Sequence, residues 1–284
     1  MVMLTPLEIR TAVRAALQED LGDGDATTLA CISENSISRA EMNAREPLVV
    51  AGLAFAEMAL RELSTSLRVI LLVPDGARAN PGEVLLTVEG TTRAILAAER
   101  VALNFVQRLS GIATLTSQFV DAVAGTSVQI LDTRKTTPGW RRFEKYAVAC
   151  GGGTNHRVGL FDLILIKDNH LAALRDEMPN AVAAAVGRAR RLYPQLRVEV
   201  EADQLSQVQQ AVEAGADIIL LDNMTPTQLR AAVAVVAGRA RTEASGGVRL
   251  ETVRAIAETG VDFISVGALT HSARSMDIGL DFTI

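Results

Sequence analysis

The chain has 284 residues, which is enough for one large domain or two smaller ones with a substantial core. Its formal net charge of -5 argues against a general affinity for nucleic acid, and no apolar run is long enough to cross a bilayer. The two cysteines, Cys31 and Cys150, exclude a disulfide framework and a CxxC metal site, and acidic residues interrupt the N-terminus before a secretory signal can form, so we expect a cytoplasmic protein.

Residues 1 to about 110 show a mixed pattern of helices and strands. Thr5, Pro6 and Glu8 have the spacing of a capping box with proline in the first turn, which predicts a helix that ends near Leu21. The strands expected after it are Arg39–Val50, Leu67–Val73 and Glu83–Val88, and the expected helices are Ala54–Ser64, Arg93–Leu109 and Ile112–Ala124. This half of the chain is typical of an α+β domain.

From Val128 onward, short apolar strands alternate with amphipathic helices. The expected strands are Val128–Asp132, Leu163–Lys167, Arg197–Glu201, Asp217–Asp222, Arg241–Glu243 and Asp262–Val266. The expected helices are Arg142–Cys150, Ala181–Leu192, Leu205–Ala214, Thr227–Ala237 and Leu250–Thr259. Glu213–Ile219 recurs as Glu258–Ile264, with a glycine between helix and strand in each copy. Because six strands are fewer than the eight of the common barrel, we expect an incomplete or modified α/β barrel.

Charged or small residues follow almost every one of these strands. In α/β barrels the carboxyl ends of the strands share one face, so these residues are expected to meet there. Arg and Lys from the early strands would form an anion-binding half, and Glu201 and Asp222 from the later strands would form an acidic half. The alternative, that these charges only mark where strands meet solvent, remains open on the spacing alone.

The segment from Asp132 to His170 concentrates basic side chains in an acidic chain, which favours a site for a small anion over a nucleic-acid surface. Gly151–Gly153 interrupt it and would let backbone N–H groups approach a ligand. The cationic and titratable residues of the segment are Arg134, Lys135, Arg141, Arg142, Lys145, His156, Arg157, Lys167 and His170. A P-loop, a GxGxxG turn after a strand, HExxH and GxSxG are all absent from the sequence.

The same segment resembles the signature of the quinolinate phosphoribosyltransferases, the decarboxylating nicotinate-nucleotide pyrophosphorylases. The matching stretches are DTRKTTPGWRRFEKYAVACGGGTNHR and GLFDLILIKDNH. LNFVQRLSGIAT, EVEAD, LLDN, SGG and VGALTHS occur elsewhere in the family's order, and EDLGDGDATT resembles its opening, so the resemblance covers nearly the whole chain. Trp140 stands where a smaller aliphatic residue is more usual, which should alter loop packing rather than chemistry.

The resemblance implies an N-terminal α/β sandwich domain of residues 1–110, joined by a C-terminal tail of about 270–284. A partly open α/β barrel of the type II phosphoribosyltransferase kind, residues 111–269, would carry the active site. It also implies that phosphoribosyl pyrophosphate and quinolinate react, with Mg²⁺, to give nicotinate mononucleotide, pyrophosphate and carbon dioxide in de novo NAD synthesis. The expected assembly is a homodimer with shared active sites, or a hexamer built as a trimer of dimers.

The resemblance also assigns residues. Quinolinate carries two carboxylates, which several fixed cations can hold, and arginine suits bidentate contacts with them. The quinolinate positions are Arg100 (from the partner subunit), Thr133, Arg134, His156, Arg157 and Lys167. The phosphoribosyl and phosphate positions are Lys135, Ser245, Gly246, Gly247, Gly267 and Ala268. Glu201 and Asp222 would hold Mg²⁺ directly or indirectly, and the expected catalytic residues are Lys135, Lys167, Glu201 and Asp222.

Decarboxylation is expected to need no dedicated base, because the ring nitrogen becomes positively charged once it carries ribose and can accept electrons. His156 and Lys167 are then the candidate proton donors. Three alternatives stay open: a paralogous phosphoribosyltransferase of similar fold, a Schiff-base aldolase with Lys167 as its nucleophile, and a non-catalytic anion-binding protein. EKYAV and KDNH favour the quinolinate enzyme over the paralogue.

Overall fold

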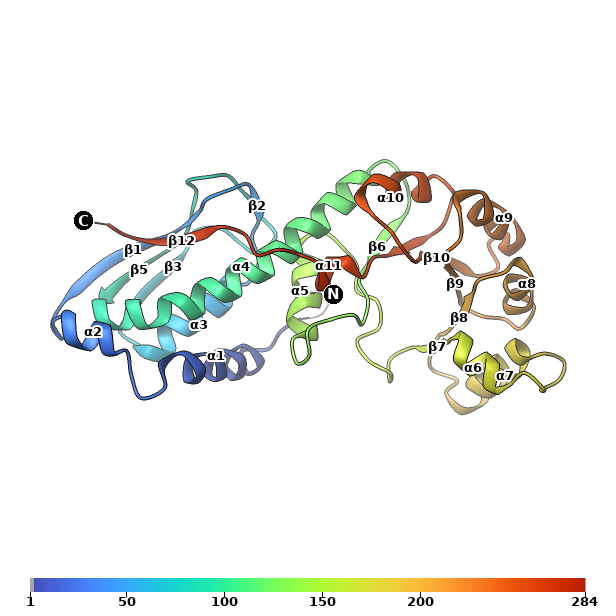
Figure 1. Cartoon of the computed structure of the whole chain (residues 1–284), viewed down its shortest axis with the longest axis horizontal. Helices are drawn as coiled ribbons and strands as arrows, with labels where there is room; N and C mark the ends of the chain where they lie inside the picture. The colour runs from blue at the N-terminus through green and yellow to red at the C-terminus, as the bar shows by residue number, and fades with distance from the viewer. Residues whose placement is uncertain (1–2, 284) are drawn as a thin grey trace. The chain divides into compact units, whose positions relative to one another are not determined.

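The computed structural model describes residues 3–283, which form two compact units (Figure 1). The first unit takes in the described residues up to 117, together with 137–152 and those from 272. The second unit consists of residues 118–136 and 153–271. Among the described residues, no helix has the length and apolar character that a membrane crossing requires.

The first unit is built on a four-stranded antiparallel sheet. Its strand order is β12-β1-β5-β3, formed by Ile278–Thr283, Ile37–Ala44, Val84–Thr91 and Arg68–Leu71. The short strands β2 (Leu48–Val49) and β4 (Arg78–Ala79) pair separately. The helices of this unit are α1 (Pro6–Leu21), α2 (Ala26–Cys31), α3 (Leu53–Leu63), most of α4 (Thr92–Ala122) and α5 (Arg141–Cys150).

Helix α1 begins as its sequence predicts. The Thr5 hydroxyl accepts a hydrogen bond from the Glu8 backbone N–H at 3.3 Å, and the Glu8 carboxylate accepts one from the Thr5 N–H at 2.9 Å. This capping box satisfies backbone donors that the first turn leaves without partners. Ile9, Val13 and Leu17 then form a buried stripe at helical spacing, and α1 packs against α3.

Helix α4 corrects the prediction of two helices, because it runs without a break from Thr92 to Ala122. Gly111, which lies between the two predicted helices, is a site of close packing. A Cβ atom at Gly111 would lie 1.8 Å from the carbonyl oxygen of Arg274, so only glycine lets the two backbones approach. The predicted strand Arg39–Val50 is also wrong in part, since residues 45–47 separate β1 from β2.

Trp140 belongs to an aromatic cluster in the first unit. Its ring stacks on Phe105 with ring centroids 5.0 Å apart, and it meets the edge of Phe143 at 5.9 Å. Phe55 stacks on the other side of the cluster, 4.8 Å from Phe105. Offset and edge-on aromatic pairs of this kind contribute packing energy beyond their buried area, so the unusual tryptophan fills space in a core.

The second unit is a six-stranded parallel sheet with the order β6-β11-β10-β9-β8-β7. These strands, taken in chain order, are Gln129–Leu131, Ile164–Ile166, Val198–Ala202, Ile218–Asp222, Arg241–Ser245 and Phe263–Ser265. All six predicted strands are therefore confirmed. Strands β6 and β7 stand at the two ends of the sheet rather than pairing with each other, which makes the barrel incomplete, as expected.

Helices connect successive strands of this sheet and follow one another along one side of it (Figure 1). The four longer ones, all predicted, are α7 (Ala181–Leu192), α8 (Leu205–Glu213), α9 (Pro226–Val236) and α10 (Leu250–Ala257). The internal repeat marks two equivalent turns: Gly215 and Gly260 have φ of 77° and 90° and lead from α8 and α10 into the next strands. The short helices α6 (Asp168–Ala173) and α11 (Ala268–His271) were not predicted.

Gly111 gives a direct test of the α4 packing. Gly111→Ala should lower the free energy of unfolding by about 1–3 kcal/mol, because the added methyl group overlaps the Arg274 carbonyl. Gly187→Ala is the matched control, since Gly187 also lies in a helix but has no atom within 4 Å of an added Cβ. That control should gain about 0.5–1 kcal/mol from helix propensity. Urea unfolding of both variants measures the difference, and equal stability of the two would contradict the packing account.

Candidate active site

A cavity of about 910 Å³ opens at the carboxyl ends of the parallel strands in the second unit. This position is where α/β barrels collect their reactive groups. It brings together every site residue that the sequence suggested within this unit: Thr133, Arg134, Lys135, His156, Arg157, Lys167, Glu201, Asp222, Ser245, Gly246, Gly247, Gly267 and Ala268. Charged side chains from the early strands and from the later strands therefore line one pocket.

Strand register explains how these side chains reach the same space. Side chains alternate along a strand, and neighbours in register point to the same face. Glu201 on β8 is in register with Leu220 on β9, which is in register with Glu243 on β10. Glu199, Glu201, Asp222, Glu243 and Ser245 consequently share the face that lines the cavity, while the helices cover the opposite face.

The basic part of the pocket contains two arginines, Arg134 and Arg157, whose charges lie close enough to interact. Burial lowers the pKa of Arg157, and the positive charge of Arg134 lowers it further. The Nε atom of Arg134 is buried and has no hydrogen-bond partner among the described residues. A buried donor without a partner is costly, so this guanidinium is suited to receive an anion.

The acidic part lies on β8 and β9. The Nζ atom of Lys167, which follows β7, forms an ion pair with Oε2 of Glu201 at 3.2 Å. The side-chain amide of Asn223 donates a hydrogen bond to Oδ2 of Asp222 at 2.7 Å. Lys167 and Glu201 thus neutralise each other in the structure, and a ligand that takes up either charge must separate them.

The turn after β10 packs tightly against the turn after β9. Asn223 adopts a left-handed backbone with φ of 54°, and its N–H donates to the Ser245 carbonyl at 2.9 Å. Gly246 has φ of 97°, and a Cβ atom there would lie 2.1 Å from the side-chain oxygen of Asn223. Glycine is therefore required at this position by both backbone conformation and space, and it lets Asn223 stay beside Asp222.

Lys135 is held at the turn after β11. The Thr270 hydroxyl donates a hydrogen bond to the Lys135 carbonyl at 2.7 Å. A Cβ atom on Gly267 would lie 3.0 Å from Cδ of Lys135 and 3.2 Å from Nε2 of His271. His271 lines the same pocket and was missed by sequence reasoning, although it lies within the VGALTHS stretch.

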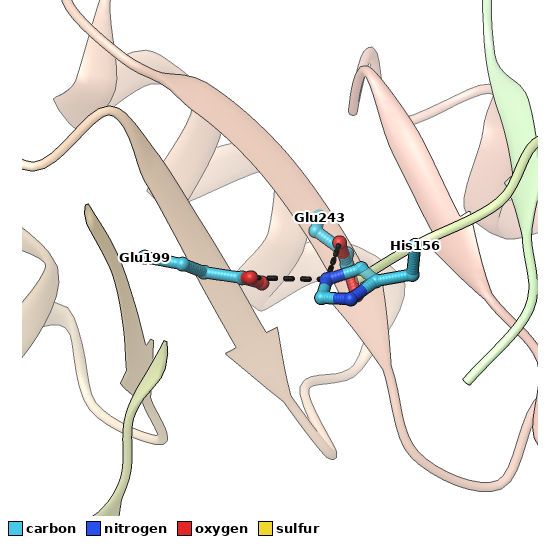
Figure 2. Close-up of side chains that lie close together, drawn as sticks. All are labelled: His156, Glu199 and Glu243. Carbon is cyan, nitrogen blue, oxygen red and sulfur yellow. Dashed lines mark hydrogen bonds and ion pairs between the residues drawn. The ribbon is translucent and has the colours of Figure 1, made fainter. Parts of the chain in front are cut away.

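His156 stands against two buried glutamates (Figure 2). Its Nε2 atom lies 3.0 Å from Oε2 of Glu199 and 3.4 Å from Oε2 of Glu243. Burial of His156 lowers its pKa, but the Glu199 and Glu243 carboxylates outweigh burial and raise the pKa to about 10. Burial raises the pKa of Glu199. Glu199 could not be singled out from the sequence, because its alternation with valines in VEVEA only marks the cavity face.

Several residues of the expected basic segment lie elsewhere. Arg142 pairs with Glu8 and Lys145 is fully buried, while Arg141 and His170 also do not line the pocket. Gly151–Gly153 do not line it either: a Cβ atom on Gly151 would lie 2.3 Å from the Ala113 carbonyl oxygen, so that glycine serves packing. Arg100 is exposed on α4 and is not among the pocket residues.

The contact between Gly246 and Asn223 can be tested by stability. Gly246→Ala should cost about 2–4 kcal/mol of unfolding free energy, because it adds a clash with Asn223 to the strain of a positive φ. Gly238→Ala is the matched control, since Gly238 has φ of 72° but no atom within 4 Å of an added Cβ. Chemical denaturation of both variants should show the smaller loss for Gly238→Ala. Equal losses of unfolding free energy in the two variants would mean that backbone strain, and not the clash with Asn223, causes the destabilisation.

Comparison with known proteins identifies related sequences and structures. Residues 25–110 match the family model "Quinolinate phosphoribosyl transferase, N-terminal domain", and residues 112–281 match "Quinolinate phosphoribosyl transferase, C-terminal domain". The chain is 47% identical to a nicotinate-nucleotide pyrophosphorylase (carboxylating) of Mycobacterium leprae, over 96% of each chain. It is 41% identical to a probable enzyme of the same name from Bacillus subtilis, over 98% of this chain and 94% of the relative.

A solved structure gives the same result for the fold. The nicotinate-nucleotide pyrophosphorylase from Francisella tularensis superimposes with a TM-score of 0.93 and 38% sequence identity. The match covers 99% of this chain and 98% of that one, so both units have counterparts in the relative.

Proposed function

The chain belongs to the quinolinate phosphoribosyltransferase family, and we propose that the 910 Å³ pocket is its active site. The reaction transfers the phosphoribosyl group of phosphoribosyl pyrophosphate to quinolinate with loss of carbon dioxide. Its products are nicotinate mononucleotide, pyrophosphate and carbon dioxide, and the step belongs to NAD biosynthesis. The single observation that carries the site assignment is the meeting of cationic and acidic side chains in one pocket at the strand ends.

The basic part of the pocket is the proposed quinolinate site. Quinolinate carries carboxylates on neighbouring ring carbons, and guanidinium groups can hold a carboxylate through two parallel hydrogen bonds. Arg134, with its unpartnered buried Nε, and Arg157 are suited to these contacts. Lys167, Thr133 and His156 line the same pocket and complete the proposed set.

The proposed phosphoribosyl pyrophosphate site lies across the pocket. The turns at Ser245–Gly247 and Gly267–Ala268 follow β10 and β11, where backbone N–H groups can face a phosphate. Lys135 stands beside Gly267 and supplies a positive charge to the same region. The glycine turns and the lysine would together hold the 5′-phosphate and orient the ribose.

Glu201 and Asp222 fit the magnesium ion that the family implies. Mg²⁺ prefers oxygen ligands and is often held by one or two carboxylates together with substrate phosphates. Both carboxylates line the pocket from adjacent strands, and the Asn223 amide fixes the orientation of Asp222. When bound, the ion would neutralise the departing pyrophosphate. In this proposal Glu201 and Asp222 also stabilise the positive charge that develops on ribose C1.

The chemistry then follows from the substrates. The quinolinate nitrogen attacks ribose C1, the bond from C1 to pyrophosphate breaks, and the nitrogen becomes positively charged. The bond to the adjacent carboxylate can then break, because its electron pair remains on a ring carbon next to that charge. Carbon dioxide leaves, and a proton is delivered to the same carbon, with His156 and Lys167 as the candidate donors. The protein's part is orientation of the carboxylate and supply of this proton.

Arg100 completes the proposal through a second copy of the chain. It is exposed on α4 and absent from the pocket lining, and the family resemblance places its counterpart in the active site of a partner subunit. We therefore infer a homodimer with shared active sites, or a hexamer made of three such dimers. A cytoplasmic location agrees with the small charged substrates of the reaction.

The aldolase alternative fits the site poorly. A Schiff base requires an uncharged amine, whereas the Lys167 amine lies 3.2 Å from the Glu201 carboxylate in an ion pair. Family membership also favours a transferase over a non-catalytic anion-binding protein.

Arg134 provides the sharpest test of the quinolinate site. Arg134→Ala should raise the KM for quinolinate by about 10- to 100-fold. This is the loss of affinity expected when a buried guanidinium no longer donates charge-assisted hydrogen bonds to a carboxylate. The KM for phosphoribosyl pyrophosphate should change little. Arg134→Lys should recover only part of the loss, because lysine keeps the charge without the planar fork. Steady-state kinetics of both variants measure these effects.

Arg230→Ala is the matched control, since Arg230 is exposed on α9 and lies outside the pocket. It should leave both KM values unchanged. An Arg134→Ala enzyme that retains its KM for quinolinate would place the dicarboxylate elsewhere.

The metal proposal predicts a dependence on Mg²⁺. Removal of divalent cations with a chelator should abolish turnover, and added Mg²⁺ should restore it, because the pyrophosphate charge is otherwise not neutralised. Glu201→Gln and Asp222→Asn should each shift the Mg²⁺ concentration for half-maximal rate upward. Full activity in excess chelator, or an unchanged Mg²⁺ requirement in both variants, would contradict the proposal.

A further inference from the structure

Two buried acids beside a pocket for a dianion need an explanation. The side chains of Glu199 and Glu243 are 0% and 1% exposed, and they lie on the cavity face of β8 and β10. A buried carboxylate is costly unless it is paired or neutralised, and a negative charge here would repel quinolinate. The cost is increased because Oε1 of Glu199 and Oε2 of Glu243 have no hydrogen-bond partner among the described residues.

His156 is the group that both acids share. Figure 2 shows both carboxylates directed at one ring nitrogen, Nε2, with Glu199 on the left of the ring and Glu243 above it. Glu199 makes a hydrogen bond to it at 3.0 Å, and Glu243 makes an ion-pair contact at 3.4 Å. The His156 backbone N–H also donates to the buried Asp132 carboxylate at 2.8 Å, so the segment that carries the ring is fixed as well.

We propose that Glu199 and Glu243 are positioning residues that clamp the His156 ring as an imidazolium, which then offers a fixed positive charge to a quinolinate carboxylate. The inference deepens the proposed function and rests on it for the identity of the substrate. The geometry carries it: two carboxylates against one ring nitrogen favour the protonated ring, whose positive charge offsets one of their two negative charges. The ring in turn reduces the repulsion between the two acids and a dianion, and it places a positive charge on the lining of the pocket.

The wider charge balance around His156 supports the cationic ring. Arg157 lies close enough to Glu199 for their charges to interact. The positive charges of Arg134 and Arg157 repel each other in the pocket. A second cavity of about 260 Å³ reaches His156 and Glu243 and is also lined by Asp162 and Arg197. The charged groups that face this region are Asp132, Arg134, Arg157, Asp162, Arg197, Glu199 and Glu243.

A metal ion is the competing explanation for the cluster. One ligand atom from each of His156, Glu199 and Glu243 lies within 4.8 Å of the others, which is compatible with a metal site. The distance of 3.0 Å between Nε2 and the Glu199 carboxylate fits a shared proton, and neighbouring ligands of one metal ion lie at a similar distance from each other. Metal analysis therefore forms one arm of the test.

The first arm of the test is an imidazole NMR titration of the unliganded full chain. The chain has three histidines, so a His156→Asn variant identifies the His156 signal. In the parent protein this signal should remain that of an imidazolium up to about pH 9, because the clamp raises the His156 pKa to about 10. In Glu199→Gln and Glu243→Gln the midpoint should fall toward the ordinary value of 6.5. A parent ring that is neutral at pH 7.5 would overturn the proposal.

The second arm is the pH dependence of binding. In each Gln variant the KM for quinolinate should rise at least about tenfold between pH 6 and pH 8.5, as the ring loses its proton, while the parent changes little over that range. The KM for phosphoribosyl pyrophosphate should stay within about twofold of the parent. A loss that is the same at both pH values would mean that the glutamates only support the fold. Glu19→Gln, an exposed change on α1, is the neutral control.

Two further outcomes are separable. Glu199→Asp and Glu243→Asp keep the charge, so they should retain an elevated His156 midpoint even if the Gln variants fold poorly. The purified protein could instead contain one metal ion per chain, and a chelator could remove this ion and shift the His156 NMR signal at the same time. That result would mean that an ion, not a proton, joins the three side chains, and it would overturn the proposal. Failure of the proposed function would appear as absent quinolinate turnover with the NMR result intact, whereas failure of the clamp would appear in the NMR titration itself.

Discussion

Parallel pairing of six strands is the constraint on which the rest of the second unit depends. It carries the carboxyl ends of β6 to β11 to one edge and turns alternate side chains toward one cavity. Residues far apart in the chain, such as Arg134, Glu201 and Gly267, meet only because of this register. The same alternation places Glu199 and Glu243 one layer below the strand ends, where they reach His156.

Several charged groups of the pocket pair with one another before any substrate binds. Lys167 is paired with Glu201, and His156 is paired with Glu199 and Glu243. Such pairs lower the free-energy cost of burying ions. A charged ligand that binds to one member of a pair must first separate it from the other member. In the proposed mechanism, a dicarboxylate that pairs with Lys167 would free Glu201 to bind a cation. A cation bound to Glu201 would in turn free Lys167 to pair with a carboxylate. The two halves of the site are in this way linked through one ion pair.

Much of this arrangement could be predicted from the sequence because it has a local cause. The six strands followed from apolar runs bounded by turns, and helix α1 followed from its capping box. The predicted division into two helices, Arg93–Leu109 and Ile112–Ala124, was wrong. Gly111, which lies between them, packs against the distant Arg274 carbonyl, and a local sequence pattern does not reveal such a contact. Glu199 was missed for the same reason, since its partner His156 comes from another part of the chain. Motif resemblance supplied the substrates, which spacing alone could not.

The most direct measurement is a turnover balance with purified protein, quinolinate, phosphoribosyl pyrophosphate and Mg²⁺. The account predicts that nicotinate mononucleotide, pyrophosphate and carbon dioxide appear in equal amounts, because each transfer to the ring nitrogen is followed by loss of the neighbouring carboxylate. Formation of the nucleotide from nicotinate but not from quinolinate, without release of carbon dioxide, would contradict the assignment of the cationic half of the pocket to a dicarboxylate.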